Sequence, residues 1–263
     1  MMKFAVVTVM PELMTPFCEQ GLVGQAYKKG LLNISVHNPR EMATDVHRTI
    51  DDRAFGGGDG MVMMAEPLML QLEKLRAEGE VLPVVLSPQG KTWTQARARE
   101  WSQIKGKTIA LFCGRYGGMD HRFVLQSGAE EISIGDYVLN GGELAAMVVI
   151  ESTARLLPGF LGNVASAVSD SFSKNLLEAP QYTRPREWRG QAVPSPLLSG
   201  HHAEIEKFLG AVSLVRTFLL RPDLVQRDQS LVSAARSLEK LNESDLAVIG
   251  LKRVDLTALL EGV

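Results

Sequence analysis

One stretch of the sequence decides its fold class: Ile132-Ser133-Ile134-Gly135-Asp136-Tyr137-Val138-Leu139-Asn140-Gly141-Gly142-Glu143-Leu144. A β-type run passes through a Gly-Asp-Tyr turn and an apolar pair, and two glycines then open a helix. Glycine leaves its backbone N–H and C=O groups uncovered, so this turn can lie directly against a flat, adenine-like ligand. The alternative is a tight strand-to-helix connection without a ligand.

Strand-type and helix-type segments alternate over the first 160 residues. The expected strands are Phe4–Met10, Leu31–His37, Val81–Ser87, Thr108–Cys113 and Glu131–Ile134. The expected helices are Pro67–Ala77, Gln95–Gln103, His121–Ser127 and Leu144–Leu157. Continuous apolar strands separated by helices of this length predict an α/β fold, with a parallel sheet covered on both faces.

The pattern changes after Pro158-Gly159. The following residues, up to Ser173, are mostly small or polar and predict a linker. Helical patterns then run over Ala203–Leu220, Leu231–Leu241 and Asp245–Leu260. We therefore expect a large α/β domain over residues 1–160, a flexible linker over 161–173, and a small, mainly helical C-terminal domain over 174–263.

The composition excludes several classes of protein. The chain has 263 residues and a formal net charge of -2, so any surface that binds nucleic acid has to be local. Cys18 and Cys113 lie in no CxxC or Cys/His pattern, which argues against a disulfide scaffold and a zinc site, and we assign no metal ligand. No leader pattern follows Met1, and no apolar stretch is long enough to span a bilayer. We expect a cytoplasmic protein without a membrane partner.

Two further glycine loops follow expected strands. They are Leu86-Ser87-Pro88-Gln89-Gly90 and Gly114-Arg115-Tyr116-Gly117-Gly118. Ligands of open α/β sheets bind beyond the carboxyl ends of the strands, where such loops collect. No GxGxxG follows the first strand and no GxxxxGK[ST] occurs, so neither common nucleotide-binding fingerprint is present. The three glycine loops together predict one pocket of another kind.

Two charged residues stand among apolar or small neighbours. Arg155 ends an expected helix, and Asp170 lies in the expected linker. Arg155 can simply interact with the helix dipole, and Asp170 can cap a following helix. A Pro-rich stretch carries Arg184, Arg186 and Arg189 beside Tyr182 and Trp188. Basic residues beside aromatic ones suit phosphate and base contacts, although a solvated surface explains them equally well.

In their order along the chain these segments resemble the bacterial tRNA (guanine-N1)-methyltransferases of the knotted SPOUT class. The resemblance rests on Asp51-Asp52-Arg53, Gly56-Gly57-Gly58, Gly60-Met61-Val62-Met63, Leu86–Gly90, Gly114-Arg115-Tyr116, Ser133–Leu144, Arg155, Pro158-Gly159, Asp170-Ser171-Phe172, Tyr182-Thr183-Arg184-Pro185, Leu198-Ser199-Gly200, His202-Ala203 and Arg221-Pro222-Asp223-Leu224. It covers nearly the whole chain as far as Leu224.

The resemblance implies a trefoil-knotted catalytic domain and a helical tRNA-binding domain in a homodimer, with each active site built from both chains. It implies S-adenosylmethionine as cofactor, dependence on Mg²⁺, and methylation of guanosine 37, just 3′ of the tRNA anticodon. The implied cofactor-binding residues are Pro88, Gly90, Gly114, Tyr116, Ile134, Tyr137, Leu139, Gly141 and Gly142. The predicted RNA-binding residues are Arg184 and His202, which lie in the matching motifs, and Arg186 of the basic stretch.

The resemblance also assigns catalytic roles. Asp170 would take the proton from guanine N1 as general base, and Arg155 would stabilise the negative charge that develops on O6. The chain departs from the family pattern at Gly117, where a glutamate is usual, and at Ala145, Gln181 and Phe208-Leu209. Two alternatives stay open: an RNA-binding relative that has lost catalysis, and a knotted methyltransferase that acts on rRNA.

Overall fold

A computed structural model describes residues 1–57, 60–162 and 170–262 of the protein. The chain divides into two compact units, Met1–Val164 and Ala165–Val263. Each unit has its own hydrophobic core.

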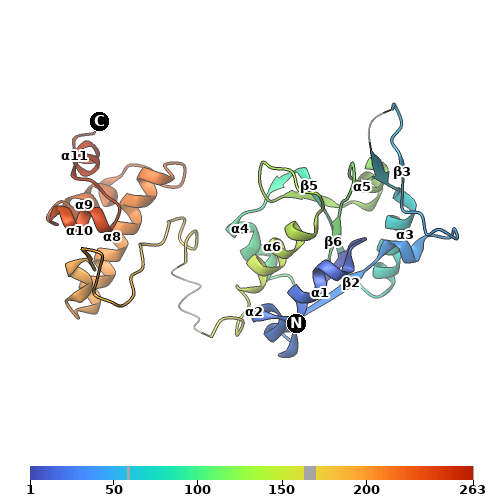
Figure 1. Cartoon of the computed structure of the whole chain (residues 1–263), viewed down its shortest axis with the longest axis horizontal. Coiled ribbons are helices and arrows are strands. Elements are labelled where there is room, and N and C mark those ends of the chain that lie inside the picture. The colour runs from blue at the N-terminus through green and yellow to red at the C-terminus, as the bar shows by residue number, and fades with distance from the viewer. Residues whose placement is uncertain (58–59, 163–169, 263) are drawn as a thin grey trace. The chain divides into compact units, whose positions relative to one another are not determined.

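The first unit is built on a parallel sheet of five strands (Figure 1). They are β1 (Met2–Val7), β2 (Leu32–His37), β5 (Val81–Thr92), β6 (Thr108–Cys113) and β7 (Glu130–Ser133). Their order across the sheet is β2-β1-β6-β5-β7, and every pair is parallel. The α/β class and the parallel sheet predicted from the apolar runs are confirmed.

Helices cover both faces of this sheet, as the buried runs predicted. Phe4 and Val6 of β1 face a core shared with α1 (Pro11–Glu19), α2 (Gly21–Lys28), α4 (Gln95–Ser102) and α6 (Glu143–Ala154). The alternate residues Ala5 and Val7 face a second core with α3 (Ala65–Ala77) and α5 (His121–Ser127). Successive side chains of a strand point to opposite faces, so one apolar strand supplies both cores.

Three features of the first unit differ from the sequence-based expectations. Helices α1 and α2 were not expected, because Pro16 inside α1 and Gly21 and Gly24 in α2 are residues that usually end helices. A hairpin of β3 (Asp51–Arg53) and β4 (Met61–Met63) was also not expected. Strand β5 continues five residues beyond the predicted end at Ser87, with a register shift against β7 between Leu86 and Lys91.

The second unit is mainly helical, as predicted. Its helices are α8 (His202–Leu220), α9 (Gln229–Leu238), α10 (Glu243–Val248) and α11 (Arg253–Glu261), and a short hairpin joins β8 (Glu187–Trp188) to β9 (Gln191–Ala192). The core includes Val215, Leu231, Leu246 and Leu256. The single helix predicted over Asp245–Leu260 is wrong: Gly250, with φ of 72°, lies between α10 and α11.

No helix among the described residues is both long enough and apolar enough to cross a lipid bilayer.

Candidate active site

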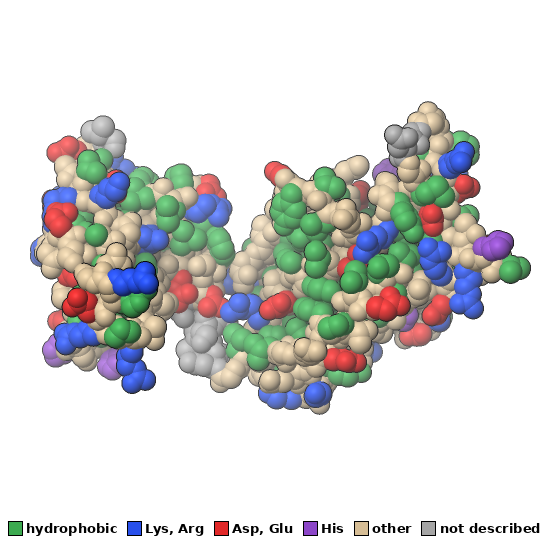
Figure 2. All heavy atoms as spheres, viewed as in Figure 1, with side chains coloured by type: hydrophobic (Ala, Val, Ile, Leu, Met, Phe, Trp, Pro, Cys, Tyr) green, Lys and Arg blue, Asp and Glu red, His purple; other side chains and the backbone are tan. Residues whose placement is uncertain are grey.

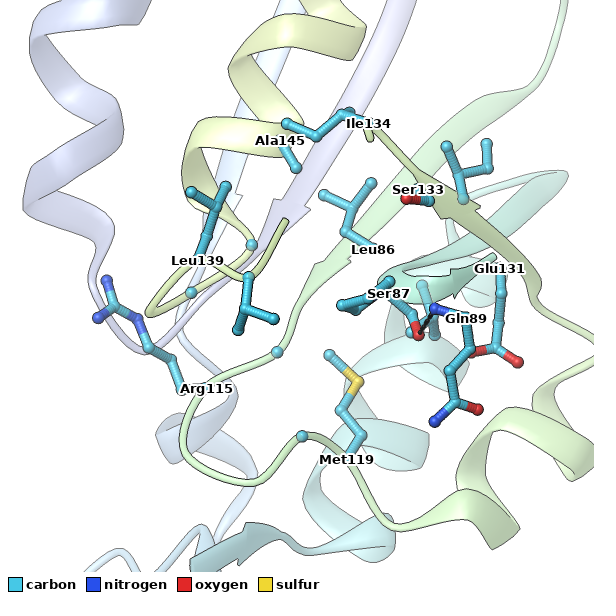
Figure 3. A pocket seen from close by; sticks show the side chains of 18 of the residues that line it. Leu86, Ser87, Gln89, Arg115, Met119, Glu131, Ser133, Ile134, Leu139 and Ala145 are labelled. Carbon is cyan, nitrogen blue, oxygen red and sulfur yellow. Dashed lines mark hydrogen bonds between the residues drawn. The ribbon is translucent and has the colours of Figure 1, made fainter. Parts of the chain in front are cut away.

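A cavity of about 650 Å³ opens beyond the carboxyl ends of β5, β6 and β7 (Figure 3). Its lining comes mainly from residues 85–89 of β5, where the pairing of this strand with β6 ends, from 114–119 after β6, and from 131–135 and 137–142 at and after β7. These are the three glycine loops. The chain therefore brings together, at one edge of the sheet, three segments that lie far apart in the sequence, as expected for an open α/β sheet.

Eight of the nine predicted cofactor-binding residues line this cavity: Pro88, Gly114, Tyr116, Ile134, Tyr137, Leu139, Gly141 and Gly142. Gly90 does not. It lies within β5, and a Cβ placed on it would fall 2.3 Å from the backbone nitrogen of Ile132 in β7. Close approach of two strands thus accounts for this glycine without a ligand.

Close backbone contact also explains Gly142. Its N–H donates to the carbonyl oxygen of Gly114 at 3.0 Å, and a Cβ on it would fall 2.7 Å from the Cα of Cys113. Its neighbour Gly141 forms an antiparallel bridge with Arg115. The loop before α6 therefore presses directly on the end of β6, and only a residue without a side chain allows this approach.

A buried carboxylate lies behind these loops. Glu143, at the start of α6, is only 2% exposed. It accepts a hydrogen bond from the Thr8 hydroxyl at 2.6 Å and forms an ion pair with Arg115, Nη2 to Oε2, at 3.1 Å. Thr8 follows β1 and Arg115 follows β6, so one carboxylate joins two strand ends to the helix that follows the third loop. Burial, and secondarily the charge of Glu143, raises the pKa of the nearby Cys113 thiol well above its ordinary value.

The loop after β7 presents apolar side chains. Gly135 has φ of 149°, a conformation that strongly favours glycine. The N–H of Gly135 donates a hydrogen bond to Ser133 Oγ at 3.2 Å. Tyr137 and Val138 beyond it are exposed, and Leu139 is 36% exposed. An apolar wall with backbone polar groups at its edge is typical of small-molecule sites.

Among the described residues that line the cavity, Glu131 is the only acid. Figure 3 shows it beside Gln89, at the end of the cavity opposite Leu139. At Gly117 the backbone N–H donates to the carbonyl oxygen of Met61 in β4 at 2.7 Å. A Cβ at this position would lie 3.0 Å from the same oxygen, so a larger residue would require a small shift of β4.

The structure places the two predicted catalytic residues in different units. Arg155 follows the last residue of α6, is half-buried, and its N–H donates to Glu151 O at 3.0 Å. Asp170 belongs to the second unit and opens a turn in which the Ser173 N–H donates to its carbonyl oxygen at 3.1 Å. Residues 163–169, most of the predicted linker, lie outside the described residues. Convergence of Arg155 and Asp170 on one ligand stays a prediction.

The predicted RNA-binding residues are exposed in the second unit. Arg184 and Arg186 precede β8, and His202 is the first residue of α8. Among the described residues, no group of three or more His, Cys, Asp or Glu side chains is arranged to hold a metal ion.

Sequence reasoning missed Thr8 and Glu131 and gave no role to Glu143. Glu143 is part of the segment that decided the fold class, but a functional role was inferred there only for the glycines and their neighbours. Thr8 was placed inside a strand expected to continue to Met10, although a polar residue that ends an apolar run is itself a signal. Glu131 is one of two adjacent acids in an apolar strand, and strand alternation alone does not tell which of them faces a cavity.

The sequence is similar to those of known proteins over most of its length. Residues 2–227 match the model of the family described as tRNA (Guanine-1)-methyltransferase TrmD. A tRNA (guanine-N(1)-)-methyltransferase of Salmonella newport is 48% identical over 227 residues, covering 86% of this chain and 88% of the relative. The relative of the same name from Polaromonas sp. is 45% identical over 255 residues, 94% of this chain and 96% of its own length. That from Pseudoalteromonas atlantica is 46% identical over 224 residues, 84% of each chain. With this match over most of its length, and a cavity formed by the loops that carry the resemblance, the chain belongs to the tRNA (guanine-1)-methyltransferase family.

Proposed function

We propose that this protein transfers the methyl group of S-adenosylmethionine to N1 of guanosine 37, the nucleotide 3′ of the anticodon of tRNA. The observation that carries the proposal is the cavity beyond β5, β6 and β7, because it is formed by the loops that carry the family pattern. Bound there, the cofactor would supply an electrophilic methyl group on a sulfonium.

The residues present fit such a cofactor. The volume of about 650 Å³ lies within the range of small-molecule sites, roughly 300–1,000 Å³. Leu86, Ile134 and Leu139 offer apolar surface for the adenine ring, and the backbone at Gly141 and Gly142 can approach it closely. Glu131 is placed to attract the positive charge of the methionine end.

The chemistry needs a base and a cation at the guanine. Guanine N1 carries a weakly acidic proton, so a carboxylate within hydrogen-bond reach can accept it, and we assign this role to Asp170. Negative charge then spreads onto O6, where the guanidinium of Arg155 stabilises it. Exposure of the N1 edge requires the base to leave the anticodon stack. Arg184, Arg186 and His202 are proposed to bind the RNA.

We further propose a homodimer in which each site uses both chains. Leu13 of α1 is 46% exposed, and Leu144 and Val148 of α6 are 58% and 45% exposed. Leu144 and Val148 are four residues apart and share one face of the helix. Figure 2 shows hydrophobic side chains gathered over this part of the first unit. We propose that a second copy covers this face, and that Arg155 and Asp170 of one active site come from different chains.

The trefoil knot, the cytoplasmic location and the Mg²⁺ requirement are carried by the family resemblance alone. For Mg²⁺ the described residues offer no cluster of ligands, and no step of the reaction is assigned to a metal.

The test is incubation of the protein with unmodified tRNA transcripts and cofactor labelled in its methyl group. We expect label at N1 of guanosine 37, found by nuclease digestion and mass spectrometry, and none in a transcript with adenosine at that position. Label in purified rRNA but not in tRNA would favour the rRNA alternative. Absence of cofactor binding by calorimetry would favour the relative that has lost catalysis.

A further inference from the structure

Trp188 is the exposed tryptophan of this protein. It ends β8 and is 59% exposed. The other two tryptophans pack edge to face in the first unit, with ring centroids 4.8 Å apart. Trp101 is buried, and Trp93 donates its Nε1–H to Ser152 Oγ at 2.8 Å. Among the described residues, the ring of Trp188 belongs to no hydrophobic core, and its Nε1–H donates no hydrogen bond.

The segment that carries Trp188 is held at both ends. Before the hairpin, the Tyr182 hydroxyl donates to the carbonyl oxygen of Val248 in α10 at 2.9 Å. After it, Ser195 donates its Oγ–H and its N–H to the carboxylate of Asp245, also in α10, at 2.6 and 3.2 Å. These hydrogen bonds on either side of the hairpin hold it against α10. Trp188 therefore lies on a segment whose two ends are fixed.

The tip of the hairpin is a tight two-residue turn. Arg189 and Gly190 both have positive φ, of 52° and 80°. This is the pattern of the turns that join adjacent antiparallel strands most closely. An arginine with positive φ is uncommon, and such conformations gather at functional sites. The turn places the Arg189 guanidinium carbon 4.7 Å from the centre of the Trp188 ring.

The surroundings of the indole are basic. Arg184, Arg186 and Arg189 are all exposed, and the only acid between Thr183 and Ala192 is Glu187. None of the three guanidinium groups forms a hydrogen bond or ion pair with another side chain of the described residues. An exposed ring among uncompensated guanidinium groups fits a polyanion whose bases are accessible, because arginine pairs with phosphate and every base can stack on an aromatic ring.

We propose that this hairpin binds a nucleotide of tRNA: Trp188 stacks on an unpaired base, and the three arginines contact the flanking phosphates. The inference rests on the proposed function and assigns different roles to the two aromatic residues of the segment. Tyr182 holds the segment on α10, whereas Trp188 contacts the RNA.

Fluorescence tests the stacking directly. The variant Trp93→Phe/Trp101→Phe retains Trp188 as the single tryptophan, and its fold is checked by circular dichroism and by methyl transfer. Titration with a tRNA transcript should quench the emission to saturation, and a blunt RNA duplex of equal length should leave it nearly unchanged. Equal quenching by the duplex would overturn stacking on an unpaired base. Quenching that rises with protein concentration in the absence of RNA would assign the surface to a protein contact instead.

Binding measurements on the otherwise unchanged chain give a second test. Trp188→Ala should weaken the Kd for tRNA by about 5- to 150-fold, the usual loss for one stacked base, while Trp188→Phe retains most of the affinity. Cofactor binding by calorimetry should be unchanged in both variants. The double variant Arg184→Gln/Arg186→Gln should bind with a shallower dependence of log K on log salt concentration.

The outcomes separate the two proposals. If the natural chain methylates tRNA and Trp188→Ala binds it with the same Kd, the role of the hairpin is wrong and the proposed function stands. If the natural chain neither binds nor methylates tRNA, the proposed function itself fails.

Discussion

Glu143 accepts a hydrogen bond from the hydroxyl of Thr8 at 2.6 Å, although 135 residues separate the two in the sequence. The same carboxylate pairs with Arg115 at 3.1 Å. The end of β1, the end of β6 and the start of α6 therefore meet at one buried charge. Because Arg115 and the residues just before Glu143 also line the cavity, the ion pair fixes two of its three loops.

The substitution Glu143→Gln should lower the free energy of unfolding by about 1–3 kcal/mol, because Arg115 loses its counter-ion at a largely buried site. It should also weaken cofactor binding, since the loops on either side of the lost ion pair become less fixed. Urea denaturation and calorimetry measure the two effects. Glu73→Gln, at an exposed position of α3, is the matched control and should change stability by less than about 0.5 kcal/mol. A variant at 143 as stable as this control would contradict the role assigned to the ion pair.

The substitution Gly142→Ala should strongly reduce cofactor affinity. The new methyl group would fall 2.7 Å from the Cα of Cys113, so the loop has to move away from the end of β6. Gly210→Ala is the control, because a Cβ at that position in α8 meets no atom within 4 Å. It should stabilise the second unit by roughly 0.5–1 kcal/mol, as expected for a helical glycine. Unchanged calorimetric binding by Gly142→Ala would show that the loop does not contact the cofactor.

The substitution Asp170→Ala should reduce the rate of methyl transfer by about 100- to 10,000-fold, the usual contribution of a general base. Binding of the cofactor should survive, because Asp170 is not among the residues that line the cavity. Single-turnover methylation separates this chemical effect from a change in tRNA affinity. Near-normal turnover by the variant would mean that another group removes the N1 proton.

The residues of the sheet and of the cavity were predictable from the sequence to different degrees. Continuous runs of Val, Ile and Leu, in which apolar and polar residues do not alternate, predicted a parallel sheet covered on both faces. Glycine loops after three strands predicted the cavity, since parallel strands end at one edge. Proline and glycine inside α1 and α2 hid these helices, because tertiary packing outweighs local propensity there. The pairing of Glu143 with Thr8 has no local signal at all.

Gly90 shows that a glycine can be required at a position for either of two structural reasons. Its place in the Leu86–Gly90 segment suggested a cofactor contact, but the approach of β5 to β7 accounts for it. Sequence alone does not distinguish a glycine that makes room for a ligand from one that makes room for a neighbouring strand. Only the register of β5 against β7, which shifts at this point, separates the two.

The acid dependence of stability should include a contribution from His37. Burial, and then the charge of Lys74, lowers the pKa of this histidine below 6.5, whereas Glu78 and Glu41 oppose the shift. The unfolded chain therefore takes up this proton at higher pH than the folded chain. The contribution of His37 to the free energy of unfolding is fully present above about pH 6.5 and is lost as the pH falls through the lower folded-state pKa.

Urea midpoints at about pH 7.5 and about pH 5.5 measure this effect. The loss of stability between the two should be smaller in His37→Gln than in the natural chain. His47→Gln, at an exposed site, is the matched control. An identical loss in His37→Gln and the natural chain would show that His37 titrates alike in both states.

The two anchors of the hairpin have a consequence for the end of the chain. The family match stops at residue 227, yet Asp245 and the carbonyl of Val248, which hold Ser195 and Tyr182 in place, both lie after it. A chain shortened at residue 227 would retain every residue of the hairpin but would lose the two α10 groups that hold Tyr182 and Ser195 in place. The segment after the match to the family model is thus a structural part of the unit that we assign to RNA binding.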